Sequence, residues 1–210
     1  EAFKVTKNVV LYTAYEKDEC NFDHVEHVTV RYGLNELVSI NLIHYAVFAS
    51  EAIIYDHNTL DMLYDSQGRM GEDLILEDMV NGKPVTMIDK HALKDMFNIR
   101  RLILPTYLTE INEYGLAKAT MLEYIHFNEH LLHIHSHALE GCRELGLVII
   151  QKLIESISES VFNNCPRATI FFEDISFTNL GMNWNGTALY YDGYEKMIMA
   201  DYSEYSLLKD

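Results

Sequence analysis

Residues 116–140 read LAKATMLEYIHFNEHLLHIHSHALE, and the secondary structure of this stretch decides the fold class. Helix formers dominate its first half, and β-branched residues are scarce throughout. At roughly 100° per residue, a polar ridge lies opposite a broad apolar arc. The ridge consists of Glu123, His126, His130, His133, His137 and Glu140, and the arc of Met121, Ile125, Phe127, Leu131, Leu132, Ile134, Ala138 and Leu139. We therefore predict a helix over 116–140.

A strand over residues 130–138 is the alternative for the second half of this stretch. His133, His135 and His137 alternate with Leu132, Ile134, Ser136 and Ala138. In a strand the three rings would share one face, with successive rings about 7 Å apart. Two of them could then ligate zinc, or one could act as a base.

Three further helices are expected on either side of this stretch. Asp89 is a candidate N-cap for a helix through Arg100, and Pro105 opens another that Gly115 ends or bends. After Gly141, a helix over 143–162 would bury the stripe Leu147, Ile150, Ile154, Ile157 and Val161.

Strands are expected toward both ends of the chain. Val9–Tyr12, His27–Tyr32 and Ala168–Phe172 are β-branched and aromatic runs. Hairpins are predicted over 74–88, with a type I′ turn at Asn81-Gly82, and over 187–199, with a turn at Asp192-Gly193. Pro84 places its strand at a sheet edge. Residues 37–55 are ambiguous, since Val38, Ile40 and Leu42 alternate as in a strand whereas 46–54 could begin a helix.

These elements predict an α+β fold, with helices in the middle of the chain flanked by N-terminal and C-terminal strands and hairpins. We expect one compact domain over 1–210, mainly β over 1–88, mainly α over 89–163 and mainly β over 164–210. Neither a linker nor an internal repeat is recognised.

Composition narrows the class of partner. Thirty-two acidic residues against sixteen basic ones give a formal net charge of −16, which repels nucleic acid and anionic lipid. Cys20, Cys142 and Cys165 are far apart and form no Cys-x-x-Cys pair. We expect reduced structural thiols, a cytoplasmic location, no cofactor and no membrane segment.

A histidine and glutamate metal site is one functional alternative. Glu123 and His126 have the Glu-x-x-His spacing of di-metal bundles, but that class needs two such motifs and this chain has one. The ridge also forms the natural solvated face of an amphipathic helix, so we predict no metal site. His135 projects into the apolar arc near Asn128, where a core histidine bonded to a backbone carbonyl is expected.

An acyltransferase-like enzyme is the second alternative, and it depends on the strand over 130–138. In that case residues 142–147 are similar to the acyl-CoA-binding turn of N-acetyltransferases, and residues 188–190 to that family's late helix, with Tyr190 as the tyrosine acid. The turn lacks the family's first glycine, and residues 191–194 predict a hairpin where the family has a helix.

The leading hypothesis is a non-catalytic binding or assembly protein, a subunit or adaptor of a larger complex. The catalytic residues are unknown, because nucleotide-binding loops, nucleophile elbows and zinc-protease motifs are all absent from the sequence. Tyrosines gather near the C-terminus, and tyrosine is frequent in protein interfaces. We therefore expect a protein partner or a second copy of this chain to contact Tyr190, Tyr191, Tyr194 and Tyr202. A helix over 130–138 favours this hypothesis, and a strand favours the enzyme.

Overall fold

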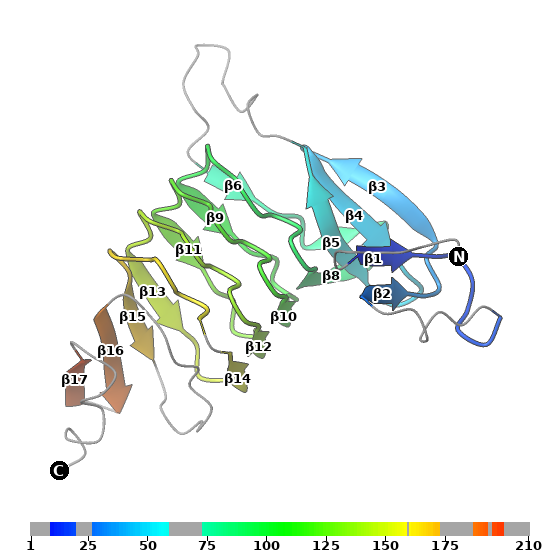
Figure 1. Ribbon diagram of the computed structural model, residues 1–210. Helices are drawn as coiled ribbons and strands as arrows, with labels where there is room; N and C mark the ends of the chain where they lie inside the picture. The colour runs from blue at the N-terminus through cyan, green and yellow to red at the C-terminus, as the bar shows by residue number, and fades with distance from the viewer. Residues whose placement is uncertain are drawn as a thin grey trace.

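The structure is a computed structural model that describes residues 9–19, 27–58, 73–158, 160–172, 187–192 and 195–199. These residues form strands and turns, without a helix, so the predicted α+β fold class is wrong. The architecture is a β-solenoid that follows a group of N-terminal strands (Figure 1). The strands are β1 (Val9–Tyr12), β2 (Val28–Arg31), β3 (Glu36–Ile40), β4 (Ile43–Val47), β5 (Ala52–His57), β6 (Asp73–Ile75), β7 (Met79–Val80), β8 (Lys83–Ile88), β9 (Arg101–Ile103), β10 (Glu110–Ile111), β11 (Tyr124–His126), β12 (His133–Ile134), β13 (Leu147–Ile150), β14 (Ser156–Ile157), β15 (Thr169–Phe172), β16 (Thr187–Asp192) and β17 (Glu195–Met199).

The solenoid consists of rungs that repeat along the chain. On one side the strands run in the order β6, β9, β11, β13, β15 and β16 (Figure 1), and neighbouring strands within each sheet pair in parallel. On the other side β8, β10, β12 and β14 pair in parallel, with Ile88, Ile111, Ile134 and Ile157 in register. Partners in this second sheet are 23 residues apart, which corrects the expectation that the chain has no repeat.

The core is built from columns of equivalent residues. Leu93, Leu116, Leu139 and Phe162 follow one another at the same interval, and each is fully buried. So do Met96, Ala119, Cys142 and Cys165. The first column holds large side chains and the second becomes smaller after Met96, so the interior is filled by side chains of matched size in successive rungs. Because a rung can bury these side chains only against its neighbours, the rungs depend on one another for stability.

Each rung turns through residues with left-handed backbone conformation. Positive φ occurs at His91, Tyr114, His137 and Ser160, and again at Asp95, Lys118, Gly141 and Asn164. The non-glycine members cost free energy. Hydrogen bonds between rungs offset that cost, for example from Lys118 N to Glu140 O at 2.7 Å and from Gly141 N to Asn163 O at 2.8 Å. The rings of His91, Tyr114 and His137 also stack, with centroids 5.2 and 4.8 Å apart.

This turn geometry explains why the predicted helices are wrong. No helix exists over 89–100, after Pro105, over 116–140 or over 143–162, and the structure has strands β9 to β14 and turns there instead. The segment from 116 to 125 buries Leu116, Ala119, Leu122 and Ile125 at steps of three, because each tight turn returns to the core after three residues. A spacing of three is close enough to the 3.6-residue helical period to imitate an amphipathic helix.

The N-terminal strands extend the second sheet of the solenoid. β5 pairs in parallel with β8, β4 is antiparallel to β5, and β3 is antiparallel to β4. β1 and β2 form a separate parallel pair. The strands predicted at 9–12, 27–32 and 168–172 are therefore confirmed, and residues 37–55 form strands rather than a helix.

The hairpin predictions have different outcomes. Asn81 and Gly82 have positive φ and join β7 to β8 in antiparallel pairing, which confirms the turn. However, β6 leaves this hairpin and pairs with β9. β8 lies inside its sheet, so the edge position predicted for Pro84 is wrong. The backbone of β16 and β17 confirms the hairpin over 187–199. The expectation of a single domain stays a prediction.

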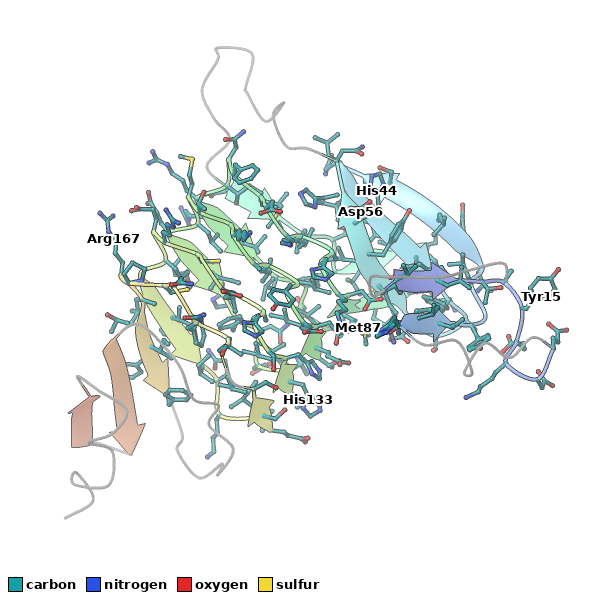
Figure 2. The ribbon with its side chains drawn as sticks, viewed as in Figure 1. Tyr15, His44, Asp56, Met87, His133 and Arg167 are labelled. Carbon is teal, nitrogen blue, oxygen red and sulfur yellow. The ribbon has the colours of Figure 1, made fainter. Side chains whose placement is uncertain are left out.

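A buried carboxylate joins the N-terminal strands to the rungs. Asp89, expected to cap a helix, is 2% exposed and accepts hydrogen bonds from Arg31 Nη2 at 2.9 Å and Tyr12 Oη at 2.6 Å. Arg31 also reaches Met87 Sδ at 3.1 Å, and Figure 2 shows Met87 at this junction. Burial alone would raise the pKa of Asp89, but the Arg31 and Tyr12 hydrogen bonds and the Arg31 charge outweigh it and hold that pKa below its ordinary value.

We expect Asp89→Asn to lower the free energy of unfolding by about 2 kcal/mol at pH 7, because Arg31 then loses its buried partner. A folded-state pKa below the unfolded one means that the carboxylate stabilises the fold at neutral pH. This stabilisation is lost as the pH falls through the folded pKa. The difference in free energy of unfolding between the wild-type protein and the variant should therefore be smaller at pH 3 than at pH 7. Urea unfolding at both pH values measures it.

Asp73→Asn is the matched control, since its partner Arg101 is about half exposed, at 3.4 Å. That exposed pair should contribute less than about 0.5 kcal/mol. Two outcomes would contradict a stabilising role for the buried Asp89 carboxylate. One is an equal loss of unfolding free energy in both variants, and the other is a loss in Asp89→Asn that is the same at pH 3 and pH 7.

Candidate functional site

The outward side chains of the strands β6, β9, β11, β13 and β15 form a face that we call the long face. The pairing aligns Asp73, Arg101 and Tyr124 in one column and Ile75, Ile103 and His126 in the next. β13 follows β11 in space (Figure 1), and its pairing with β15 aligns Leu147 with Thr169 and Ile149 with Phe171. Residues between these columns, such as Leu102, Ile125 and Val148, point into the core.

Charged groups at the β6 end of the long face are matched within the chain. Arg101 Nε lies 3.4 Å from Asp73 Oδ1, and the Arg101 guanidinium lies 5.9 Å from the centroid of the Tyr124 ring. The neighbouring Arg100 lies 3.7 Å from Glu123. The charges of this half of the face are therefore balanced, and Ile75, 67% exposed, adds an apolar side chain to it.

The middle of the long face is apolar. Leu147 is 49% exposed and Ile149 is 39% exposed, side by side on β13. Tyr124 on the preceding strand is 39% exposed. Contiguous exposed apolar side chains mark contact surfaces more often than scattered ones do. We call Tyr124, Leu147 and Ile149 the apolar patch.

The opposite sheet carries a polar strip along β10, β12 and β14. Glu110, His133 and Ser156 share one outward column. His133 Nδ1 lies 2.9 Å from Ser156 Oγ, and His135 Nε2 lies 2.7 Å from Glu110 Oε1. The hydrogen bond with His135, together with the nearby charges of His135 and Arg31, outweighs burial and lowers the pKa of Glu110. Figure 2 places His133 beside β12 and β14, away from the long face.

The histidines therefore do not form the predicted ridge. His126 lies on β11 in the long face, whereas His133 lies on β12 in the other sheet. His135 is 41% exposed and bonded to Glu110, so its predicted burial against a backbone carbonyl is wrong. The strand alternative placed successive histidine rings on one face about 7 Å apart. This is right for His133 and His135, whose ring centroids are 6.4 Å apart. Among the described residues, no three histidine, cysteine or acidic side chains are placed to hold a metal ion.

The resemblance to N-acetyltransferases does not hold in the structure. Residues 142–147 lead into the strand β13 where that family has a helix. Residues 188–190 lie in the strand β16. From the sequence alone, a strand over 130–138 favours the acyltransferase-like enzyme and a helix favours the binding protein. The chain has neither the acetyltransferase fold nor the helical α+β fold, so the strand at His133–Ile134 does not favour the enzyme.

The structure describes the backbone of two of the four tyrosines that were predicted to contact a partner. Tyr190 and Tyr191 belong to β16, which pairs with β15 and continues the sheet of the long face. Tyr194 and Tyr202 lie outside the described residues. The role of all four tyrosines stays a prediction.

Sequence reasoning missed the apolar patch because it assigned Leu147 to the buried stripe of a helix and Tyr124 and Ile149 to no surface. The interval of 23 residues was the available signal. It appears in Leu122-x-x-Ile125-x-Phe127 and Leu145-x-x-Val148-x-Ile150, whose intervening positions all face outward except Gly146. Recognising this repeat would have identified Leu147 and Ile149 as surface residues.

Comparison with known proteins agrees with this architecture. Residues 73–184 match the model of the BspA type leucine-rich repeat region, in six copies. A leucine-rich repeat protein from Bacteroides capillosus is 16% identical, with a TM-score of 0.53 over 67% of this chain and 100% of that one. The pneumococcal vaccine antigen PcpA is 17% identical, with a TM-score of 0.55 over 77% of this chain and 51% of that one. Both likenesses concern the fold. No curated protein matches the sequence significantly.

The described residues contain no helix with the length and hydropathy needed to cross a membrane.

We expect the Glu110 carboxyl to titrate below its ordinary midpoint, because the hydrogen bond with His135 favours its charged form. His135→Asn should return the midpoint toward the ordinary value. Carbon chemical shifts of the side-chain carboxyl, followed from pH 7 to pH 2, measure it. His130→Asn is the control, since that ring lies near Thr106 O on another turn. An unchanged midpoint in the His135 variant would show that the contact is not formed in solution.

Proposed function

The chain belongs to the BspA-type leucine-rich repeat family, and from that premise we propose that it is a non-catalytic protein-recognition module, a subunit or adaptor that binds its partner through the long face. The repeat fold commonly mediates protein–protein interaction or surface adhesion, and leucine-rich repeat proteins typically bind protein partners. The cytoplasmic location expected from the sequence stays a prediction.

The apolar patch is the observation that carries the proposal. Leu147 and Ile149 project from a rigid strand whose other side chains, Val148 and Ile150, are anchored in the core. Such side chains are already ordered, so a partner that covers them gains apolar burial at a small entropic cost. Removing each large apolar side chain from water contributes about 1 to 2 kcal/mol.

Charged side chains beside the apolar patch could form the polar rim of an interface. Arg101 and Asp73 are already paired with each other, so a partner need not supply a buried counter-charge for them. The net charge of −16 attracts a partner with a basic periphery and increases its rate of association. We therefore assign the partner an apolar centre and a basic rim.

The C-terminal hairpin extends the same sheet, and we include it in the proposed contact. β16 follows β15 in register, so a partner lying across the strands from β11 onward would reach it. The residue types Tyr190, Tyr191, Tyr194 and Tyr202 suit such a contact, as interfaces are rich in tyrosine.

A library of random peptides displayed on phage provides a partner of defined chemistry. We expect selection on the full chain to enrich peptides that combine large apolar with basic residues. Binding of an enriched peptide should weaken at least about tenfold in Leu147→Asp or Ile149→Asp, since each change removes an apolar contact and places a carboxylate against the peptide's apolar side chains. Raising the salt concentration should slow association more than it speeds dissociation.

Leu153→Asp is the matched control. Leu153 is 57% exposed and lies after β13, outside the long face. The same chemical change there should leave peptide affinity within about twofold, as expected of a site without contact. Equal weakening by Leu153→Asp and Ile149→Asp would remove the long face as the binding surface, provided that thermal unfolding shows all variants folded.

A further inference from the structure

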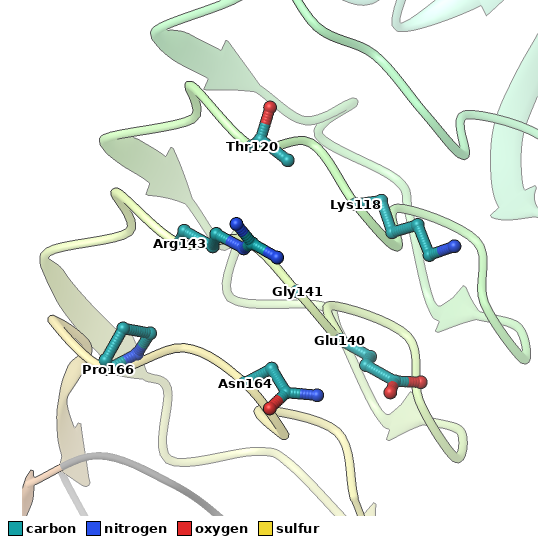
Figure 3. A pocket seen from close by; sticks show the side chains of 7 residues that line it. All are labelled: Lys118, Thr120, Glu140, Gly141, Arg143, Asn164 and Pro166. Atoms are coloured by element: carbon teal, nitrogen blue, oxygen red, sulfur yellow. The ribbon is translucent and has the colours of Figure 1, made fainter.

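A hollow of about 560 Å³ opens where the turns of three consecutive rungs pass one another. It lies apart from the outward side chains of the long face and of the polar strip. Figure 3 shows its lining, which comes from the turns at 118–120, 140–143 and 164–166. A volume of this size accommodates a small organic molecule.

Two cations line the hollow without a carboxylate partner. Of the arginines that the structure describes, all but Arg143 form an ion pair with an acidic residue, namely Arg31, Arg100, Arg101 and Arg167. Arg143 is exposed at the hollow, and so is Lys118 one rung earlier. Neither has a carboxylate within ion-pair distance in the described part of the chain. Acidic residues outnumber basic ones two to one in the chain as a whole, whereas the lining of this hollow has two cations and one carboxylate.

Gly141 leaves the centre of the hollow without a side chain. Its φ of +78° belongs to the left-handed region, and a Cβ built there would lie 3.4 Å from Lys118 Cγ. The equivalent positions in the adjacent rungs are Lys118 and Asn164, each with a side chain. The absent side chain at 141 therefore leaves space between those of Lys118 and Asn164.

The remaining groups of the lining add donors and one opposing charge. Thr120 supplies a hydroxyl and Asn164 an amide. Glu140 also lines the hollow, but its carboxylate accepts a hydrogen bond from Asn163 Nδ2 at 3.3 Å, and its other oxygen lies 2.9 Å from His137 Nδ1. The charge of Glu140 opposes those of Arg143 and Lys118, so it weakens the attraction of the hollow for an anion.

We propose that this hollow is a binding site for a small oxyanion, a phosphate or carboxylate group, held by Arg143 and Lys118 with Thr120 and Asn164 as neutral donors. Arg and Lys are the side chains that bind such groups through charge-assisted hydrogen bonds. The ligand is small because a polyanion would meet the field of a chain with a net charge of −16. The oxyanion is either free in solution or carried by a small organic molecule that fills more of the hollow.

Titration of the full chain with inorganic phosphate at constant ionic strength tests the site, with calorimetry and amide chemical shifts of 118, 141 and 143 as readouts. We expect saturable binding with a dissociation constant on the order of 1 mM. Arg143→Gln and Lys118→Gln should each weaken it about tenfold, the effect of losing one charged hydrogen bond. Glu140→Gln should strengthen it, because a like charge is removed.

Arg167→Gln is the matched control, since Arg167 is an exposed arginine on a neighbouring turn that is already paired with Glu144. It should change phosphate affinity less than twofold. Glucose 6-phosphate binding more tightly than inorganic phosphate would identify an organic ligand, and equal affinities would identify the free anion. Absence of saturation, equal loss in Arg167→Gln and Arg143→Gln, or tighter binding of heparin than of phosphate would overturn the proposal.

Discussion

The structure depends on registered stacking between rungs. Each of the strands β8, β10, β12 and β14 places an isoleucine over its counterpart in the next rung, and the column of Leu93, Leu116, Leu139 and Phe162 does the same at the turns. Backbone hydrogen bonds at the turns cross between the same rungs. Burial and hydrogen bonding are thus satisfied by neighbours in space, which explains how strands of two to four residues can form a stable sheet. The left-handed residues at the turns are tolerated for the same reason.

Two of the solenoid's sheets change from parallel to antiparallel pairing at one end. The sheet of β8 passes through β5 into the antiparallel β4 and β3, and the sheet of β15 passes through β16 into the antiparallel β17. An antiparallel hairpin needs no further rung beside it, so it interrupts the stacking pattern. At the first of these ends the Asp89 carboxylate accepts hydrogen bonds from Arg31 and Tyr12 of the N-terminal strands and from Asn112 of the next rung, so it joins the two parts of the fold. The repeated residues specify how rungs stack, and the residues of this junction specify where stacking starts.

Local strand and turn signals were predictable from the sequence, whereas the repeated middle was not. β1, β2, β15, the Asn81-Gly82 turn and the last hairpin depend on short-range preferences, and those predictions hold. The middle failed because Leu116, Ala119, Leu122 and Ile125 satisfy a helical pattern locally, and only comparison with residues 139–148 distinguishes a rung from a helix. The same error hid the apolar patch, since a helix over 143–162 buries Leu147. Pairings between distant segments, such as Arg31 with Asp89 and Arg101 with Asp73, leave no local pattern and required the fold.

Contacts restricted to adjacent rungs have a mechanical consequence. If the chain is stretched from its two ends, the load reaches one terminal rung at a time, since no strand of the repeated part spans the whole solenoid. Each rung between β8 and β14 that detaches frees 23 residues, or about 80 Å of extended chain, before the next begins to resist. Extension would then proceed as a series of similar small steps in place of one abrupt rupture. A protein of this build can yield under tension by a fixed length and recover that length, rung by rung, when the tension falls.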